Sequence, residues 1–313
     1  MKLNKNTLPA PFTFTITTCN VLYEPYYVQY VHDQPMSIKK RCLAFKKSLE
    51  HETALDKSDI LCFQEWPYKP GIVRKQFEED TLLVRGKKIT KKEYSIKHTT
   101  TQPNLFLNYL TFFYPPTDYY YLMDSIAEKD GVLTLINKHR FKILSYKFTV
   151  FTPNKKMLTA IITPHTSHYP LGIINAHIPF AREKTPPKEL ARIRDEIKNY
   201  SKNQPWIICG DFNYTVLQGT NYLNKEKYQQ LKQFFPNMHS NAEIITQPTS
   251  TSSRTGFNLN DFIFFSKNIK PLEIHQFPEL SKDLLRHFPE DLKKKNYFSD
   301  HAIIRMKLNI KNN

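Results

Sequence analysis

The chain has few cysteines, and they are not spaced as zinc ligands usually are. Its 313 residues include four cysteines, and no two of them form a CxxC pair. Cys19, Cys42, Cys62 and Cys209 are scattered along the chain, each among apolar neighbours. This pattern argues against a structural zinc site and predicts buried free thiols in a reducing compartment.

Long apolar runs are also missing. The N-terminal segment MKLNKNTLPAPFTF has no apolar stretch of the kind found in a secretory signal. No run of about 18 apolar residues, the length needed to cross a bilayer, occurs anywhere in the sequence. We therefore expect a cytoplasmic protein without a transmembrane segment, and we expect it to be a monomer.

Acidic residues are also few in comparison with basic residues. Asp and Glu total 29 against 45 Lys and Arg, which gives a formal net charge of +16. Such an excess favours a polyanionic partner, either nucleic acid or an anionic membrane surface. A general bias toward Asn, Lys, Ile, Tyr and Phe accounts for part of it. Apolar residues make up 40% of the chain and aromatic residues 13%, enough for a sizeable folded core.

Short apolar or alternating runs dominate the organisation of the chain and predict strands. They lie at 12–21, 59–65, 132–137, 141–151, 157–163, 171–178, 206–212, 261–265 and 302–310. Helical spacing follows Ser37 and again follows Pro186 and Pro187, with a weaker third helix near 225–235. Many strands with few helices predict an α/β fold of two packed sheets with helices outside, and the length fits one large domain or two small ones. The segments 66–95 and 101–125 lack clean periodicity, and we expect long surface loops there.

Polar side chains recur where these apolar runs begin or end. Asn20, Glu65, His177, Asp211 and Asp261 each lie at or beside a separate run. Asp300 and His301 immediately precede the last run. A single such residue is more often a turn or capping residue. Because burying a charge is costly unless it is paired or binds a metal, the whole set predicts one convergent polar site at the strand edges.

The residue types in this set suit metal-assisted attack on a phosphate ester. Mg²⁺ prefers oxygen ligands, typically one or two carboxylates with water and phosphate, and Glu65 and Asp300 fit that role. We expect Mg²⁺ as the cofactor, with Mn²⁺ as a substitute.

The remaining members suit the handling of water and of the transition state. Asp211 could orient and deprotonate the attacking water. Asn213, Asn20 and a protonated His301 could stabilise the negative charge that develops at phosphorus. Asp261 is the candidate partner of His301. His177 is a second imidazole that could contact the phosphate.

Six short motifs occur in order: TTCN, FQE, NAH, GDFN, NDF and SDH. The ordered set resembles the endonuclease/exonuclease/phosphatase superfamily, which includes DNase I, and the resemblance runs from about residue 12 to residue 310. It implies a four-layer α/β/β/α sandwich in a single domain over 1–313. It also implies that Asn20 joins Glu65 and Asp300 near the metal, while His177, Asp211, Asn213, Asp261 and His301 act in catalysis.

Three segments resemble the Ccr4/nocturnin branch of that superfamily. They are NVLYEPYY near the first motif, DGVLTLINKHRF at 130–141 and TGFNLNDFIFFS at 255–266. GDFNY after Trp206 is similar to part of a 5-phosphatase motif, but the PxWCDR motif of those enzymes is absent. The membrane-seeking element usual in sphingomyelinases is not evident either.

The sequence therefore predicts a magnesium-dependent nuclease that acts on single-stranded nucleic acid, with RNA favoured over DNA. Lys293, Lys294 and Lys295 precede the last motif, and Arg182 follows His177; these four residues are candidate contacts to the substrate backbone. One alternative keeps the reaction class and acts on a phosphoinositide, a nucleotide or a sphingolipid headgroup. Another is a non-catalytic interaction protein on the same scaffold.

Overall fold

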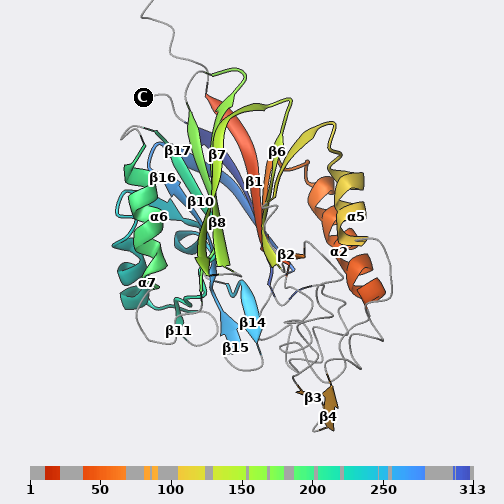
Figure 1. The fold of residues 1–313 in the computed structure, drawn as a ribbon. Coiled ribbons are helices and arrows are strands. Elements are labelled where there is room, and N and C mark those ends of the chain that lie inside the picture. The colour runs from red at the N-terminus through yellow and green to blue at the C-terminus, as the bar shows by residue number, and fades with distance from the viewer. Residues whose placement is uncertain are drawn as a thin grey trace, which may run out of the picture.

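The computed structural model describes most of the chain, and its elements form layers (Figure 1). The described residues are 11–21, 38–67, 81–84, 87–90, 105–123, 130–152, 155–167, 170–179, 187–200, 204–218, 222–245, 247–252, 256–278, 299 and 301–310. Two six-stranded sheets lie face to face in the middle of the molecule, and helices cover their outer faces.

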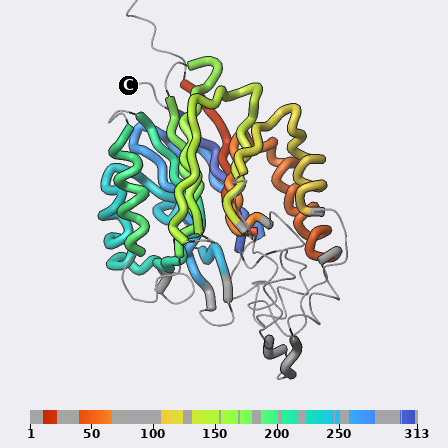
Figure 2. Tube along the Cα trace, in the orientation of Figure 1, coloured from red at the N-terminus to blue at the C-terminus, as the bar shows by residue number. Residues whose placement is uncertain are grey.

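The first sheet combines strands from both ends of the chain. Its order is β17 (Ile269–Phe277), β18 (Ile303–Ile310), β1 (Phe12–Asn20), β2 (Ile60–Pro67), β6 (Asp130–Asn137) and β5 (Tyr119–Met123). β1 pairs with β18 antiparallel and with β2 parallel. Figure 2 shows the red N-terminal strand directly beside the blue C-terminal one.

The second sheet comes from the middle of the chain. Its order is β13 (Met238–Ser240), β16 (Asp261–Ser266), β10 (Trp206–Asp211), β9 (Leu171–His177), β8 (Lys155–Pro164) and β7 (Phe141–Thr152). β9 and β10 are parallel, whereas the other neighbouring pairs are antiparallel. Both sheets are therefore mixed.

In the described ranges, four helices complete a four-layer α/β/β/α sandwich. α2 (Ile38–Ala54) and α5 (Leu105–Phe113) pack on the outer face of the first sheet. α6 (Glu189–Lys198) and α7 (Lys225–Lys232) cover the second. Shorter elements are the pairs β3 (Thr81–Val84) with β4 (Lys87–Thr90), β11 (Leu217–Gln218) with β12 (Tyr222–Leu223), and β14 (Ser250–Ser252) with β15 (Gly256–Asn258), and a 3₁₀ turn at Asn241–Glu243.

Alternation along the strands explains why the sheets stack. Successive strand residues point to opposite faces. In β2, Ile60 and Cys62 join the core between the sheets, while Leu61 and Phe63 pack under α2 and α5. In β10, Ile207 and Cys209 point inward. Each of these strands is thus apolar on both faces, as strands covered on both sides must be.

The structure confirms the predicted α/β sandwich, corrects one expected loop and adds strands that the sequence did not predict, β17 among them. All nine predicted strands are present, and the helices α2, α6 and α7 lie where helical spacing indicated. All four cysteines are buried thiols outside any disulfide. The expectation of a surface loop over 101–125 is wrong for residues 105–123, which form α5 and β5 with Phe106, Leu110 and Leu122 buried.

The expected loop at 66–95 lies largely outside the described residues, and its described part contains the β3–β4 pair. Within the part of the chain that the structure covers, no helix combines the length and the apolar character needed to cross a bilayer.

Candidate active site

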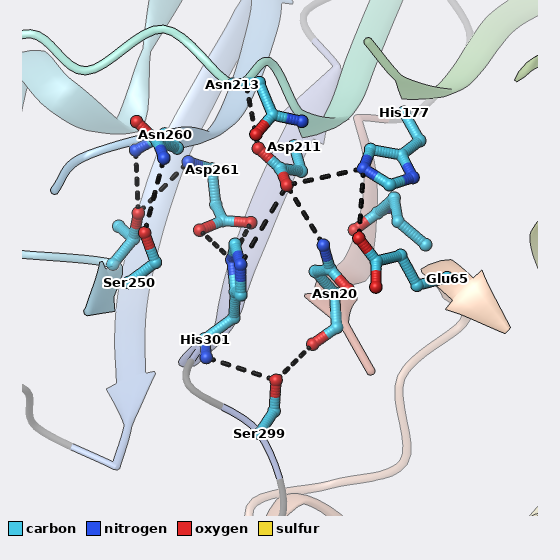
Figure 3. Close-up of polar contacts among 12 residues, drawn as sticks. Asn20, Glu65, His177, Asp211, Asn213, Ser250, Asn260, Asp261, Ser299 and His301 are labelled. Carbon is cyan, nitrogen blue, oxygen red and sulfur yellow. Dashed lines mark hydrogen bonds and ion pairs between the residues drawn. The ribbon is translucent and has the colours of Figure 1, made fainter. Parts of the chain in front are cut away.

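Strand register brings the predicted site residues to one edge of the two sheets. Asp211 ends β10 and pairs with His177 at the end of parallel β9, and it also pairs with Asp261 at the start of antiparallel β16. In the first sheet, Asn20 at the end of β1 pairs with Gln64, the neighbour of Glu65. Because parallel strands end at the same edge, side chains that are far apart in the sequence meet there (Figure 3).

Asp211 lies at the centre of the cluster and is 2% exposed. Its Oδ2 accepts a hydrogen bond of 3.0 Å from Asn20 Nδ2, across the two sheets. The same oxygen lies 3.6 Å from His177 Nε2 and 3.9 Å from His301 Nε2. Its Oδ1 accepts from the backbone N–H of Asn213 at 2.8 Å. One carboxylate thus lies between two imidazoles and an amide donor.

His301 pairs with Asp261 on one side of Asp211. His301 Nδ1 lies 2.9 Å from Asp261 Oδ2 and 3.1 Å from Oδ1. The Asp261 carboxylate accepts a hydrogen bond from Nδ1–H, and Nε2 is the ring nitrogen that faces Asp211. Burial raises the pKa of Asp261, and the nearby Asp211 carboxylate acts in the same direction, while the His301 imidazole opposes the shift.

Hydroxyl groups accept hydrogen bonds from the backbone N–H groups of both residues of this pair. Thr249 Oγ1 accepts from the backbone N–H of Asp261 at 3.0 Å. Ser299 Oγ accepts from the backbone N–H of His301 at 3.1 Å and donates to the Asn20 carbonyl at 2.8 Å. Ser250 forms an isolated bridge with His301. Ser299 therefore links the segment before β18 to the end of β1.

His177 lies on the other side of Asp211, beside Glu65. Its Nε2 is 3.4 Å from Glu65 Oε1, and Lys155 Nζ lies 3.5 Å from the same oxygen. Burial lowers the pKa of His177 well below its usual range, and the positive charge of Lys155 and the second imidazole, His301, lower it further. His177 is therefore a neutral imidazole at neutral pH.

Two of these residues have an unusual backbone conformation that orients their side chains. Glu65 and Asn213 have φ values of 52° and 49°, in the left-handed region that few residues other than glycine adopt. Asn213 is held there by its bond to Asp211 and by donation from Nδ2 to the Ile178 carbonyl at 2.8 Å. Such conformations persist only where the surroundings enforce them, and they cluster at functional sites.

A glycine permits the close approach of β9 and β10 just before Asp211. Gly210 has a φ of 144°, and a Cβ at this position would overlap the backbone carbonyl of Ala176. Only glycine combines this conformation with this contact. Asp211 and His177 can therefore lie in register.

The donor set agrees with a hard divalent cation bound by few protein ligands. Among the described residues, no group of three His, Cys, Asp or Glu side chains is arranged to hold a metal. Glu65 offers carboxylate oxygens, and Asn20 turns its Nδ2 toward Asp211, which directs its amide oxygen away from that carboxylate. Mg²⁺ needs only one or two carboxylates because it keeps several waters. The two residues thus suit Mg²⁺ better than a cation that needs a full protein cage.

Several predicted site residues lie outside the described residues. They are the proposed metal ligand Asp300 and the proposed substrate contacts Arg182, Lys293, Lys294 and Lys295. The structure brings together the other seven, which are Asn20, Glu65, His177, Asp211, Asn213, Asp261 and His301.

The sequence interpretation missed Lys155, the hydroxyls of Thr249 and Ser299, and the backbone bridge of Ser250 with His301. A lysine at the start of a strand resembles any solvated lysine. Serines and threonines are too common to stand out without their contacts. Ser299 gave the only available signal, because it belongs to the SDH motif.

Comparisons with known proteins agree with the fold and the order of motifs. The model of the Endonuclease/Exonuclease/phosphatase family matches residues 27–301. No curated protein sequence matches the chain significantly. Among solved structures, ANGEL2, a 2',3'-cyclic phosphatase in complex with adenosine-2',3'-vanadate, aligns with a TM-score of 0.59 at 17% identity, covering 96% of each chain.

Two further structures are similar over nearly the whole chain. The human nocturnin catalytic domain with bound sulfate has a TM-score of 0.57 at 16% identity and covers 97% of this chain and 94% of its own. Humanised D. rerio TDP2 has a TM-score of 0.57 at 14% identity, with 95% and 98% covered. At identities this low, the structural similarity establishes the fold alone. The fold is DNase I-like, as expected. The family match spans most of the sequence, so the chain belongs to the endonuclease/exonuclease/phosphatase family, whose members are hydrolases of phosphate esters and generally depend on a divalent metal.

Proposed function

We propose that the protein is a magnesium-dependent phosphodiesterase that cleaves single-stranded nucleic acid, with RNA favoured over DNA. The observation that carries the proposal is the position of Asp211, a buried carboxylate between a neutral His177 and an Asp261-paired His301. The net charge of +16 supports a polymeric anion as the substrate. The proposal also includes a cytoplasmic, monomeric protein.

Asp211 is the proposed general base. A water beside its carboxylate would lose a proton to it and attack phosphorus. Asn20 and the Asn213 backbone N–H both donate to Asp211 and hold its carboxylate in one orientation. The carboxylate can therefore orient the water without moving.

His301 is the proposed donor to the transition state. Asp261 fixes its Nδ1, so Nε2 faces the edge where a phosphate would bind. A protonated Nε2 would donate to a phosphoryl oxygen as negative charge develops there. His177, being neutral, would donate or accept a single hydrogen bond at the Glu65 side.

Glu65 and Asn20 would hold the metal, together with Asp300. When bound, Mg²⁺ supplies positive charge that offsets the negative charge of the phosphoryl oxygens. The inward-facing Glu65 carboxylate and the Asn20 amide provide the hard oxygen donors that this ion prefers.

The test is a substrate panel with wild type and Asp211→Asn, a variant of the same shape that cannot accept the water's proton. We expect wild type to cleave single-stranded RNA with Mg²⁺ and to lose this activity with EDTA. Asp211→Asn should lower turnover by about 10²–10³-fold or more.

The same assay compares single-stranded RNA with four other substrates, which are DNA, a phosphoinositide, a nucleotide and sphingomyelin. Turnover of a lipid or a nucleotide without nuclease activity would replace the proposal by the alternative substrate class. Full biological function of Asp211→Asn would support the non-catalytic alternative instead. A size-exclusion measurement with light scattering checks the monomer.

A further inference from the structure

Lys155, the first residue of β8, brings a positive charge to the Glu65 side of the site. Its Nζ lies 3.5 Å from Glu65 Oε1 and 3.2 Å from His177 Nδ1, and it also contacts His177 Nε2. Met157 pairs with Ala176, the residue before His177, so the register of β8 and β9 fixes this placement. The Lys155 side chain is 18% exposed, which leaves part of it accessible from outside the protein.

The contacts of Lys155 leave donor capacity for a ligand. An ammonium group has three N–H donors and no acceptor. Among the described residues, its polar partners are one Glu65 oxygen and the His177 ring, which can accept only at an unprotonated nitrogen. A third N–H is available for another acceptor at the same edge of the sheets.

The negative charges of the cluster favour a cationic side chain at this place. Glu65, Asp211 and Asp261 place three carboxylates where a phosphate anion would have to bind. Like charges at this range repel, and burial strengthens the repulsion. Within the described part of the chain, Lys155 is the one lysine or arginine in contact with any of these three carboxylates.

We propose that Lys155 is a substrate-binding residue whose ammonium binds a non-bridging oxygen of the phosphate group that is hydrolysed. Glu65 and His177 hold the ammonium in place for this contact. The assignment rests on the proposed function, because it needs a phosphate ester at the edge that Asp211 faces. It gives the Glu65 side of the site a donor to phosphate, opposite the donor that His301 provides.

The variants Lys155→Met and Lys155→Arg test this assignment, with Lys142→Met as the matched control. Lys142 is exposed on β7, next to β8, so its replacement removes the same charge from the same sheet. Inorganic phosphate is the probe, measured by calorimetry and as a competitive inhibitor. Losing one charge-assisted hydrogen bond should weaken phosphate binding and raise KM about 10- to 100-fold in Lys155→Met. Lys155→Arg should recover part of the loss, and Lys142→Met should match wild type.

Mn²⁺ binding without substrate separates a substrate contact from mere support of Glu65. We expect Lys155→Met to bind Mn²⁺ as tightly as wild type or more tightly, because the ammonium no longer neutralises Glu65. Unchanged phosphate affinity, or a loss of Mn²⁺ binding as large as the loss of phosphate binding, would overturn the assignment. Phosphate calorimetry needs no turnover, so its result stands even if wild type hydrolyses nothing and the proposed function fails.

Discussion

Glu52 on α2 is 3% exposed and lies in a polar cluster away from the candidate active site. Its Oε1 accepts from the Ser58 and Thr17 hydroxyls and lies 3.7 Å from Arg305 Nε. Burial raises its pKa from 4.5 to about 7, although these partners oppose the shift. The folded protein therefore keeps a proton on Glu52 at pH values where the unfolded chain has lost it.

This shift predicts a pH-dependent stability. As pH rises from about 4.5 to about 7, Glu52 should lower the unfolding free energy by about 3 kcal/mol, because the unfolded chain releases the proton first. Glu52→Gln cannot titrate, so its stability relative to wild type should rise over this window. Urea unfolding across the pH range measures the difference. Glu50→Gln, on the exposed side of the same helix, is the control; an equal trend in both variants would contradict the prediction.

His301 permits a second prediction for a single residue. His301→Ala removes the imidazole between Asp261 and Asp211, so we expect kcat to fall about 10²–10³-fold with little change in KM. Steady-state kinetics on the preferred substrate measure this split. His275→Ala on β17, an exposed histidine, should leave both constants unchanged. A rise in KM with normal kcat would indicate ground-state binding instead.

At the scale of elements, the spacing between β9 and β10 depends on Gly210. Gly210→Ala would place a Cβ on the Ala176 carbonyl at a φ of 144°, and neither backbone can move without breaking the pairing. We expect a loss of more than about 3 kcal/mol in unfolding free energy. Because Asp211 is the next residue, activity should fall by more than this loss of stability alone explains. Thermal unfolding measures the first effect.

Gly172→Ala is the comparison for Gly210→Ala. There the added Cβ would overlap the buried Trp206 ring, so a side chain and not a backbone carbonyl would have to shift. The stability loss should be smaller than for Gly210→Ala, and activity should be affected less. Equal losses would show that backbone overlap is not what makes Gly210 necessary.

A buried amide pair joins the two sheets directly beneath the site. Gln64 Nε2 donates to Asn175 Oδ1 at 2.7 Å, and Asn175 Nδ2 donates to the Phe63 and Leu133 carbonyls and to Thr134. Gln64 precedes Glu65, and Asn175 lies two residues before His177. The pair therefore sets the distance between the sheets at the point where Glu65 and His177 meet.

Asn175→Ala should cost about 2–3 kcal/mol, because it leaves buried polar groups without partners. A double-mutant cycle with Gln64→Ala, measured by urea unfolding, should give a coupling of about 1 kcal/mol or more. Thr159→Val is the control, since the Thr159 hydroxyl is buried and has no hydrogen-bond partner among the described residues. It should be neutral or stabilising; zero coupling in the cycle would mean that the amides act independently.

The sequence indicated most elements but not all of them. α5 was missed because LFLNYLTFF is apolar on nearly every face, which hides the four-residue spacing of Phe106 and Leu110 that the structure shows. β17 was missed because Pro271 interrupts its pattern; it is an edge strand, where proline is tolerated, with a register shift next to that residue. The formation of α5 and of β17 therefore depends on tertiary packing partners more than on the periodicity of their own sequences.

For the whole molecule, the net charge of +16 predicts a salt-dependent reaction with a polymeric substrate. The logarithm of kcat/KM for a single-stranded RNA should fall with the logarithm of salt concentration, by about 0.7 per phosphate contact. A small phosphodiester such as bis(p-nitrophenyl) phosphate makes contact only at the site and should respond weakly. Equal slopes for the two substrates would argue for a small-molecule substrate.

The sequence by itself determined the α/β class, nine of the strands and seven residues that the structure brings to one edge. Apolar alternation and polar strand ends are local features of the chain, and the ordered motifs that resemble a known family supplied the rest, Asn20 and Asp261 above all. The sequence proposed Asp261 as the partner of His301, and the structure shows the two in contact. Only the tertiary structure decided that Asp211 lies between two imidazoles and that Lys155 contacts Glu65 and His177. These contacts follow from strand order and register, which depend on pairing between segments far apart in the chain and cannot be read from any one of them.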